Sequence, residues 1–147
     1  MRSNDPQEFL SLDEKAIVEQ AIAQAESCTS AEIKFVIARY CWSNISDKAA
    51  RIFKKLGLHR TDQRNCVLIL LVTANREFFI YGDCGIHERA GQAHWDDVRN
   101  RMAEKFQQDA FADGIAEAAG MIGQKLAEHF PRRHDDVNEI TNEVDYQ

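Results

Sequence analysis

The sequence predicts an α/β fold, in which a mixed sheet is covered by helices on both faces. Three observations lead to this prediction. Residues 66–72 are all apolar, which is typical of a central strand covered above and below. Residues 32–39 alternate in a second strand pattern, and amphipathic helical patterns lie before, between and after the strands. The chain has 147 residues, the usual size of one domain.

The N-terminal segment predicts an arm followed by a helix. Residues 1–10 are polar and should form a loose arm. Ser11 and Glu14 then have the spacing of a capping box, in which each side chain accepts a hydrogen bond from the backbone N–H of the other. Apolar residues recur at helical spacing after Ser11, so this helix should run to about Glu26.

A strand and a short helix follow. In residues 32–39 the odd-numbered side chains should point to one face of the sheet and the even-numbered side chains to the other. Ser46 can cap a short helix with an apolar face, and Gly57 would end it.

The central strand should belong to a hairpin. Residues 73–76 form a tight turn between the apolar run 66–72 and a further strand at 77–81. So short a connection requires antiparallel neighbours. The first two strands are separated by a helix, so we expect them to be parallel, joined by a right-handed crossover.

Two helices and a tail complete the chain. The first helix carries an apolar stripe, and the second is capped near Asp113 and closed by Pro131. The stripe consists of Trp95, Val98, Met102 and Phe106. Residues 132–147 are polar and acidic and should be mostly disordered. The predicted domain therefore spans residues 11–131.

Composition excludes several functional classes. The net charge of −6 argues against electrostatic binding to nucleic acid or to an anionic membrane, which needs clustered cations. The longest apolar run is about a third of the roughly 20 residues of a transmembrane helix. The N-terminus lacks the apolar region of a signal peptide, so a cytoplasmic location is the default. The four cysteines have no metal-binding spacing and should be reduced thiols.

The predicted topology brings polar side chains to one end of the sheet, where the first two strands begin and the third ends. That rim collects Thr29, Ser30, Glu32, His59, Arg60, Thr61, Asn65, Asp83 and His87. Each also has a structural interpretation: Asp83 between glycines can form a turn, and Asn65 can cap the strand entry. The opposite edge, with Tyr40, Trp42, Asn75 and Arg76, offers fewer groups for chemistry.

Four segments resemble a known family. They are residues 29–33 (TSAEI), 64–69 (RNCVLI), 78–82 (FFIYG) and 106–114 (FQQDAFADG). In this order, over residues 9–131, they resemble the motifs of the TPM domain, a family of thylakoid-lumen, photosystem II repair and bacterial proteins. Residues 59–61 and 82–87 resemble its soluble bacterial branch. The resemblance implies a Rossmann-like α/β/α sandwich, with acid phosphatase activity in a plant member and divalent-cation binding, chiefly calcium.

The chain departs from the family pattern at two positions. Arg64 stands where an acidic residue often precedes the central Asn, and Cys66 stands at the following Gly. Replacing a carboxylate by a cation should weaken a calcium site at the rim.

Two functions follow, and a third stays open. We favour a non-catalytic module that binds a cation or a partner protein and assists other complexes, because no nucleophile–base pair is recognisable. The alternative is a metal-assisted acid phosphatase acting on phosphate monoesters, with Ca²⁺ or Mg²⁺ as cofactor. In it Asp83 and Glu32 would hold the cation, Arg60 would bind phosphate, and His59 or His87 would transfer protons. Thr29, Ser30 and Asn65 would complete the binding site. A redox function would require Cys66 and Cys84 to meet.

Overall fold

The computed structural model describes residues 2–87, 92–132 and 140–147. Its centre is a four-stranded mixed sheet in the order β3-β2-β1-β4. Strand β1 (Glu32–Ala38) lies parallel to β2 (Cys66–Val72), and β3 (Glu77–Gly82) pairs with β2 in the antiparallel direction. The parallel pair and the hairpin predicted from the sequence are both confirmed.

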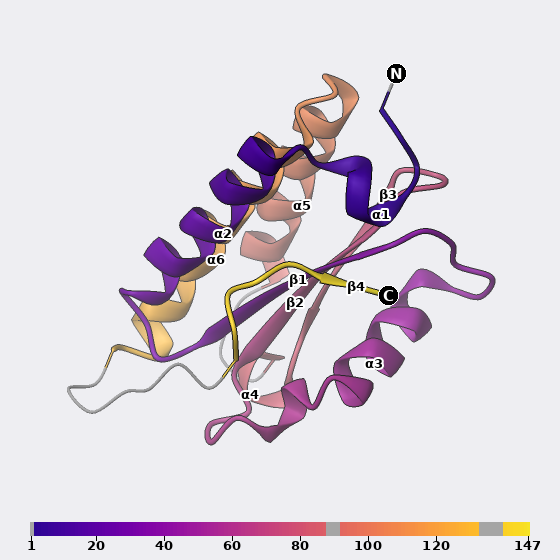
Figure 1. Ribbon diagram of the computed structural model, residues 1–147. Helices are drawn as coiled ribbons and strands as arrows, with labels where there is room; N and C mark the ends of the chain where they lie inside the picture. The colour runs from indigo at the N-terminus through magenta and orange to yellow at the C-terminus, as the bar shows by residue number, and fades with distance from the viewer. Residues whose placement is uncertain (1, 88–91, 133–139) are drawn as a thin grey trace.

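Helices cover both faces of the sheet (Figure 1). Helices α2 (Leu12–Glu26), α5 (Gln92–Gln107) and α6 (Phe111–His129) pack on one face, and α3 (Ile45–Lys55) packs on the other. The three-layer α/β/α sandwich is therefore confirmed. Among the residues that the structure describes, none of the helices has the length and apolar composition of a transmembrane span.

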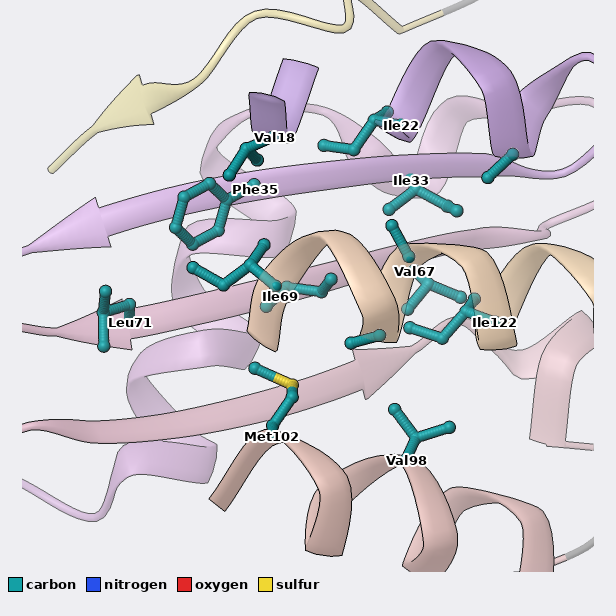
Figure 2. Close-up of a cluster of buried hydrophobic side chains, with 14 of the residues drawn as sticks. Val18, Ile22, Ile33, Phe35, Val67, Ile69, Leu71, Val98, Met102 and Ile122 are labelled. Carbon is teal, nitrogen blue, oxygen red and sulfur yellow. The ribbon is translucent and has the colours of Figure 1, made fainter. Parts of the chain in front are cut away.

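The alternation of the strands produces two apolar layers. The odd-numbered residues of β1 and β2 face the layer of α2, α5 and α6, and the even-numbered apolar residues face α3. Figure 2 shows the first layer, in which Ile33, Phe35, Val67, Ile69 and Leu71 meet Val18, Ile22, Val98, Met102 and Ile122. Every residue of β2 is buried, because helices cover the strand on both sides.

Side-chain caps fix where two of the helices begin. The predicted capping box of α2 is present: Glu14 N–H donates to Ser11 Oγ at 3.1 Å, and Ser11 N–H donates to Glu14 Oε1 at 3.0 Å. Helix α3 is capped by Asn44 instead of Ser46, whose own N–H donates to Asn44 Oδ1 at 2.9 Å. The prediction placed this cap two residues too late, because both residue types are good caps.

The N-terminal arm is packed, so the prediction of a loose arm was wrong. It contains a short helix, α1 (Pro6–Phe9), and Phe9 is buried against Phe111 with the ring centroids 4.9 Å apart. Arg2 donates to Phe9 O at 2.7 Å and to Glu14 Oε1 at 2.8 Å. One buried aromatic ring and one ion pair therefore attach a segment whose overall composition is polar.

The C-terminal residues join the sheet, which the predicted disordered tail of residues 132–147 did not anticipate. Strand β4 (Asp145–Tyr146) lies parallel to β1 at Val36 and Ile37, and Val144 N–H donates to Glu19 Oε2 at 2.9 Å. A strand of two residues is too short to show an alternating pattern. Part of the predicted tail, residues 133–139, lies outside the described residues.

Candidate functional site

Three distant segments meet at the end of the sheet where β1 and β2 begin and β3 ends. Glu32 N–H donates to Asn65 O at 3.2 Å, and Asp83 N–H donates to Cys66 O at 3.1 Å. Gln63 Nε2 donates to Ser30 Oγ at 3.3 Å. We call this end the rim; a 3₁₀ turn, η1 (Leu58–Arg60), and a short helix, α4 (Cys84–His87), flank it. The convergence expected from topology is present.

The carboxylate of Asp83 is bound by Arg64. Arg64 Nε donates to Asp83 Oδ2 and Arg64 Nη2 donates to Asp83 Oδ1, both at 2.8 Å. Asp83 Oδ1 also accepts the N–H of Cys84 at 2.7 Å, where α4 begins. The Asp83 side chain is only 5% exposed. Both of its oxygens are therefore occupied by a guanidinium and a helix N-terminus.

Backbone geometry holds Arg64 in this position. Its φ of +53° is in the left-handed region, which non-glycine residues seldom adopt. Gly85 N–H donates to Arg64 O at 3.0 Å. A Cβ at Gly85 would lie 2.5 Å from Gln63 O and 2.6 Å from Arg64 O, so the loop before β2 approaches as closely as glycine permits.

The hydroxyl side chains at the rim hold the backbone. Thr29 Oγ1 and Ser30 N–H both donate to Phe130 O, the second at 2.8 Å, which attaches the end of α6 to the entry of β1. Thr61 Oγ1 accepts the N–H of Asn65 at 3.1 Å and shapes the loop before β2. These contacts give Thr29, Ser30 and Thr61 a structural role.

The amide of Asn65 differs from its neighbours. The residue is 1% exposed, yet neither its Oδ1 nor its Nδ2 has a hydrogen-bond partner among the described residues. Nδ1 of His59 is also buried without one. Burying such groups unpaired is costly, so they are the rim's groups most available to a bound water or ligand. Arg60 is exposed, and the side chain of His87 lies outside the described residues.

Glu32 faces a second carboxyl group, that of Glu26. Both side chains are buried, and Glu26 Oε2 accepts the N–H of Ile33 at 2.7 Å. Burial, together with the charge and hydrogen bonding of Glu32, raises the pKa of Glu26 to about 8, although the Ile33 N–H and Arg132 act in the opposite direction. Near neutral pH the pair therefore holds a proton.

Sequence reasoning missed Glu26, which it took only as the end of the first helix. One signal could have found it: a second acid lies six residues before Glu32, across a short turn. The turn folds α2 back onto β1 and brings the two carboxyls together.

Comparison with known proteins identifies the family. The sequence profile of the TPM domain matches residues 3–125. The chain belongs to the TPM domain family. The NMR structure of BA42 from the psychrophilic bacterium Bizionia argentinensis is 31% identical, with a TM-score of 0.92, covering 99% of this chain and 100% of that one. A search of curated proteins found no match.

Two structures of lower sequence identity share the fold. The N-terminal domain of a protein from P. gingivalis is 16% identical with a TM-score of 0.69, covering 90% of this chain and 85% of that one. The N-terminal domain of cg2496 from Corynebacterium glutamicum is 14% identical with a TM-score of 0.60, covering 92% and 79%.

In this TPM domain the cysteines near the rim are not paired. Cys66 is a buried free thiol, and Cys84 is an exposed one. Burial raises the pKa of Cys66 well above its ordinary value, and the charges of Glu32, Glu26 and Asp83 add to the effect. A thiol that resists ionisation is a poor nucleophile, which argues against the redox interpretation. Among the residues described, no three His, Cys, Asp or Glu side chains cluster as a metal site would need.

A pocket of about 210 Å³ lies between β3 and α5 and extends to Ile86 of α4, beside the rim. Its lining includes Phe78, Ile80, Gly82, Ile86, Trp95 and Arg99. Strand β3 is an edge strand of the sheet, and β2 is its one neighbour among the residues that the structure describes. Because Asp83 N–H bonds to Cys66 O, the alternation of an antiparallel ladder turns the backbone groups of Phe78 and Ile80 outward.

Proposed function

We propose that this TPM domain is a non-catalytic module that binds an extended segment of a partner protein along β3 and thereby assists the assembly of other complexes. The observation that carries the proposal is the open edge of β3 beside the apolar pocket. An extended peptide can add to such an edge through backbone hydrogen bonds, while pockets select its side chains.

The composition of β3 supports this use. Exposed edge strands are normally protected by lysine, proline or a bulge. Residues 77–82 (EFFIYG) contain no lysine or proline, and Phe78 and Ile80 are half-buried on the pocket side. An apolar side chain of the peptide would enter the pocket. Arg99 at its border is exposed and forms an ion pair with Asp96 at 2.7 Å, so a carboxylate of the peptide would share this arginine with Asp96.

The rim supports a non-catalytic function. A metal-assisted hydrolase needs a free carboxylate to hold the cation, but Arg64 and the N–H of Cys84 occupy both oxygens of Asp83. The arginine supplies internally the positive charge that a bound cation would otherwise provide.

Selection from a random-peptide phage library tests the proposal. We expect enrichment of peptides with alternating apolar residues. Ile80→Pro removes an N–H that points away from the sheet and leaves the hydrogen bonds to β2 intact. It should lower the affinity for these peptides about tenfold, because one hydrogen bond is lost and the proline ring blocks the approach of the peptide. Ile80→Val keeps the N–H and is the matched control. Failure to enrich any peptide, or equal binding by both variants, would contradict the proposal.

The alternative is a metal-assisted acid phosphatase acting on phosphate monoesters. The unpartnered polar atoms of Asn65 and His59 favour a ligand at the rim. In this function Asp83 and Glu32 would bind Ca²⁺ or Mg²⁺. Hydrolysis of p-nitrophenyl phosphate that requires the cation and is lost in Asp83→Ala would support it. Thermal stabilisation by the cation without hydrolysis would instead indicate a cation-binding module.

A further inference from the structure

The face of α3 that points away from the sheet is basic, although the protein is acidic. Residues 39–60 contain six Lys and Arg residues against one Asp, a net charge of +5. Because the whole chain carries −6, the remaining residues together carry −11. Helix α3 lies on one side of the sheet, and α2, α5 and α6 lie on the other (Figure 1). Positive charge is therefore concentrated in the segment of the chain that contains α3.

The cations lie on successive turns of α3. Its buried side consists of Ala49, Ile52 and Phe53. The other side presents Lys48, Arg51, Lys54 and Lys55, of which the last three are exposed. None of them is in an ion pair within the part of the chain that the structure describes. We call these four residues, with Arg39 and the aromatic pair described next, the basic face.

An exposed aromatic pair adjoins the helix. Trp42 is 90% exposed and Tyr40 is 46% exposed. Their rings stack with centroids 5.2 Å apart and planes at 23°, and the Arg39 guanidinium lies 5.4 Å from the centre of the Tyr40 ring. Arg51 Nη2 donates to Ser43 Oγ at 3.1 Å, which attaches this loop to α3. Aromatic rings and cations thus belong to one continuous surface.

The positive charge of this surface is not neutralised by its hydrogen bonds. Lys55 Nζ donates to Gln147 Oε1 at 3.0 Å, and Arg51 donates to a serine hydroxyl, so both acceptors are neutral. Asp47 is the one carboxylate within residues 39–60, and it lies in the first turn of α3. The surface therefore presents a net positive potential to a partner.

We propose that the basic face docks the protein peripherally on an anionic phospholipid surface. Lysine and arginine side chains are attracted to anionic headgroups, and tryptophan and tyrosine settle at headgroup depth with an apolar body and a polar tip. The cations spread over the outer surface of a helix, which suits a broad anionic plane. The remaining residues carry −11 and are repelled by the same plane, which favours orientations with the basic face toward it.

Vesicle binding with a single-tryptophan reporter tests the proposal. Trp95→Phe leaves Trp42 as the one tryptophan, because the chain has two. With phosphatidylcholine–phosphatidylserine vesicles at about 0.1 M salt, where charges are screened beyond about 10 Å, we expect co-sedimentation and a blue-shifted Trp42 emission. Both should disappear with phosphatidylcholine alone and weaken as salt is added.

Two double variants distinguish binding through the basic face from a general effect of the protein's net charge. Lys54→Gln with Lys55→Gln should lower vesicle partitioning about 25-fold, since each charge near an anionic membrane contributes about fivefold. Lys105→Gln with Lys125→Gln, on α5 and α6, changes net charge equally and should bind as the parent does. Circular dichroism confirms that each variant is folded.

Three results would overturn the proposal. The first is that the protein does not associate with phosphatidylserine vesicles, and the second is that both double variants lose vesicle binding equally. The third is tighter binding to single-stranded DNA or polyglutamate than to the vesicles. The last would mean that the aromatic pair and cations serve nucleic acid or an acidic polypeptide.

Discussion

Replacing Glu26 by Gln should remove much of the pH dependence of the protein's stability. In the folded state burial, assisted by Glu32, raises the pKa of Glu26 from its ordinary 4.5 to about 8. Below pH 4.5 the carboxyl is protonated in both the folded and the unfolded state. Between these values the unfolded chain ionises while the folded protein keeps the proton, so the free energy of unfolding falls as pH rises.

The magnitude follows from the size of the shift. Each pKa unit corresponds to about 1.4 kcal/mol, so the rise from 4.5 to about 8 can lower the free energy of unfolding by at most about 5 kcal/mol. Because Glu32 shares the proton, we expect about 2 to 4 kcal/mol of this for Glu26 alone. A glutamine at this position stays neutral, accepts the N–H of Ile33 and can donate to Glu32. The free energy of unfolding of Glu26→Gln should therefore be higher than that of the wild type by this amount at pH 8, and equal to it in acid.

Urea denaturation followed by far-UV circular dichroism, at pH values from acid to about 9, measures the effect. Glu104→Gln is the matched control: it removes the same charge, but Glu104 is exposed on α5 and is not part of a buried carboxyl pair. Its pH profile should follow the wild type. The reasoning is refuted if the wild-type stability stays level or increases toward pH 8, or if Glu26→Gln keeps the wild-type slope.

Two further predictions concern the rim. Gly85→Ala should destabilise the protein by roughly 1–3 kcal/mol in chemical denaturation, because the new methyl group would lie 2.5 Å from Gln63 O. Gly120→Ala in α6 is the control: its methyl group meets nothing within 4 Å, so it should stabilise the protein by about 0.5–1 kcal/mol. Asp83→Ala should lower the thermal midpoint more than Arg64→Ala, because it removes the acceptor for both the guanidinium and the Cys84 N–H; equal midpoints would contradict this.

The periodicity of the apolar residues and the capping residues were enough to predict most of the sheet and its long helices. The apolar run of β2, the alternation of β1 and the capping box at Ser11 each specify one local structure. The arm and the two-residue β4 escaped prediction because their order depends on tertiary contacts with residues far away in the sequence, such as that of Phe9 with Phe111. No local pattern encodes such contacts.

The rim shows the same division between pattern and contact. Topology predicted which segments meet, and the unusual Arg64 was visible in the sequence. Its partner was not, because Asp83 is 19 residues away and the pairing depends on the left-handed backbone at Arg64. Trp42 was placed at the edge with fewer reactive groups, since the sequence does not reveal that its ring is 90% exposed and stacked on Tyr40.

The two proposed surfaces lie on different sides of the sheet, and this arrangement has a consequence. The pocket beside β3 is lined by α5, whereas the basic face belongs to α3 (Figure 1). A molecule docked through α3 would therefore keep its β3 pocket accessible to a partner away from the membrane. Peptide affinity should then be equal for free and vesicle-bound protein, because neither event covers the other's surface. Ile80→Pro should leave vesicle partitioning unchanged, and the Lys54→Gln, Lys55→Gln double variant should leave peptide affinity unchanged. Cross-effects between the two sets of variants would show that the surfaces are coupled or that one site has been misplaced.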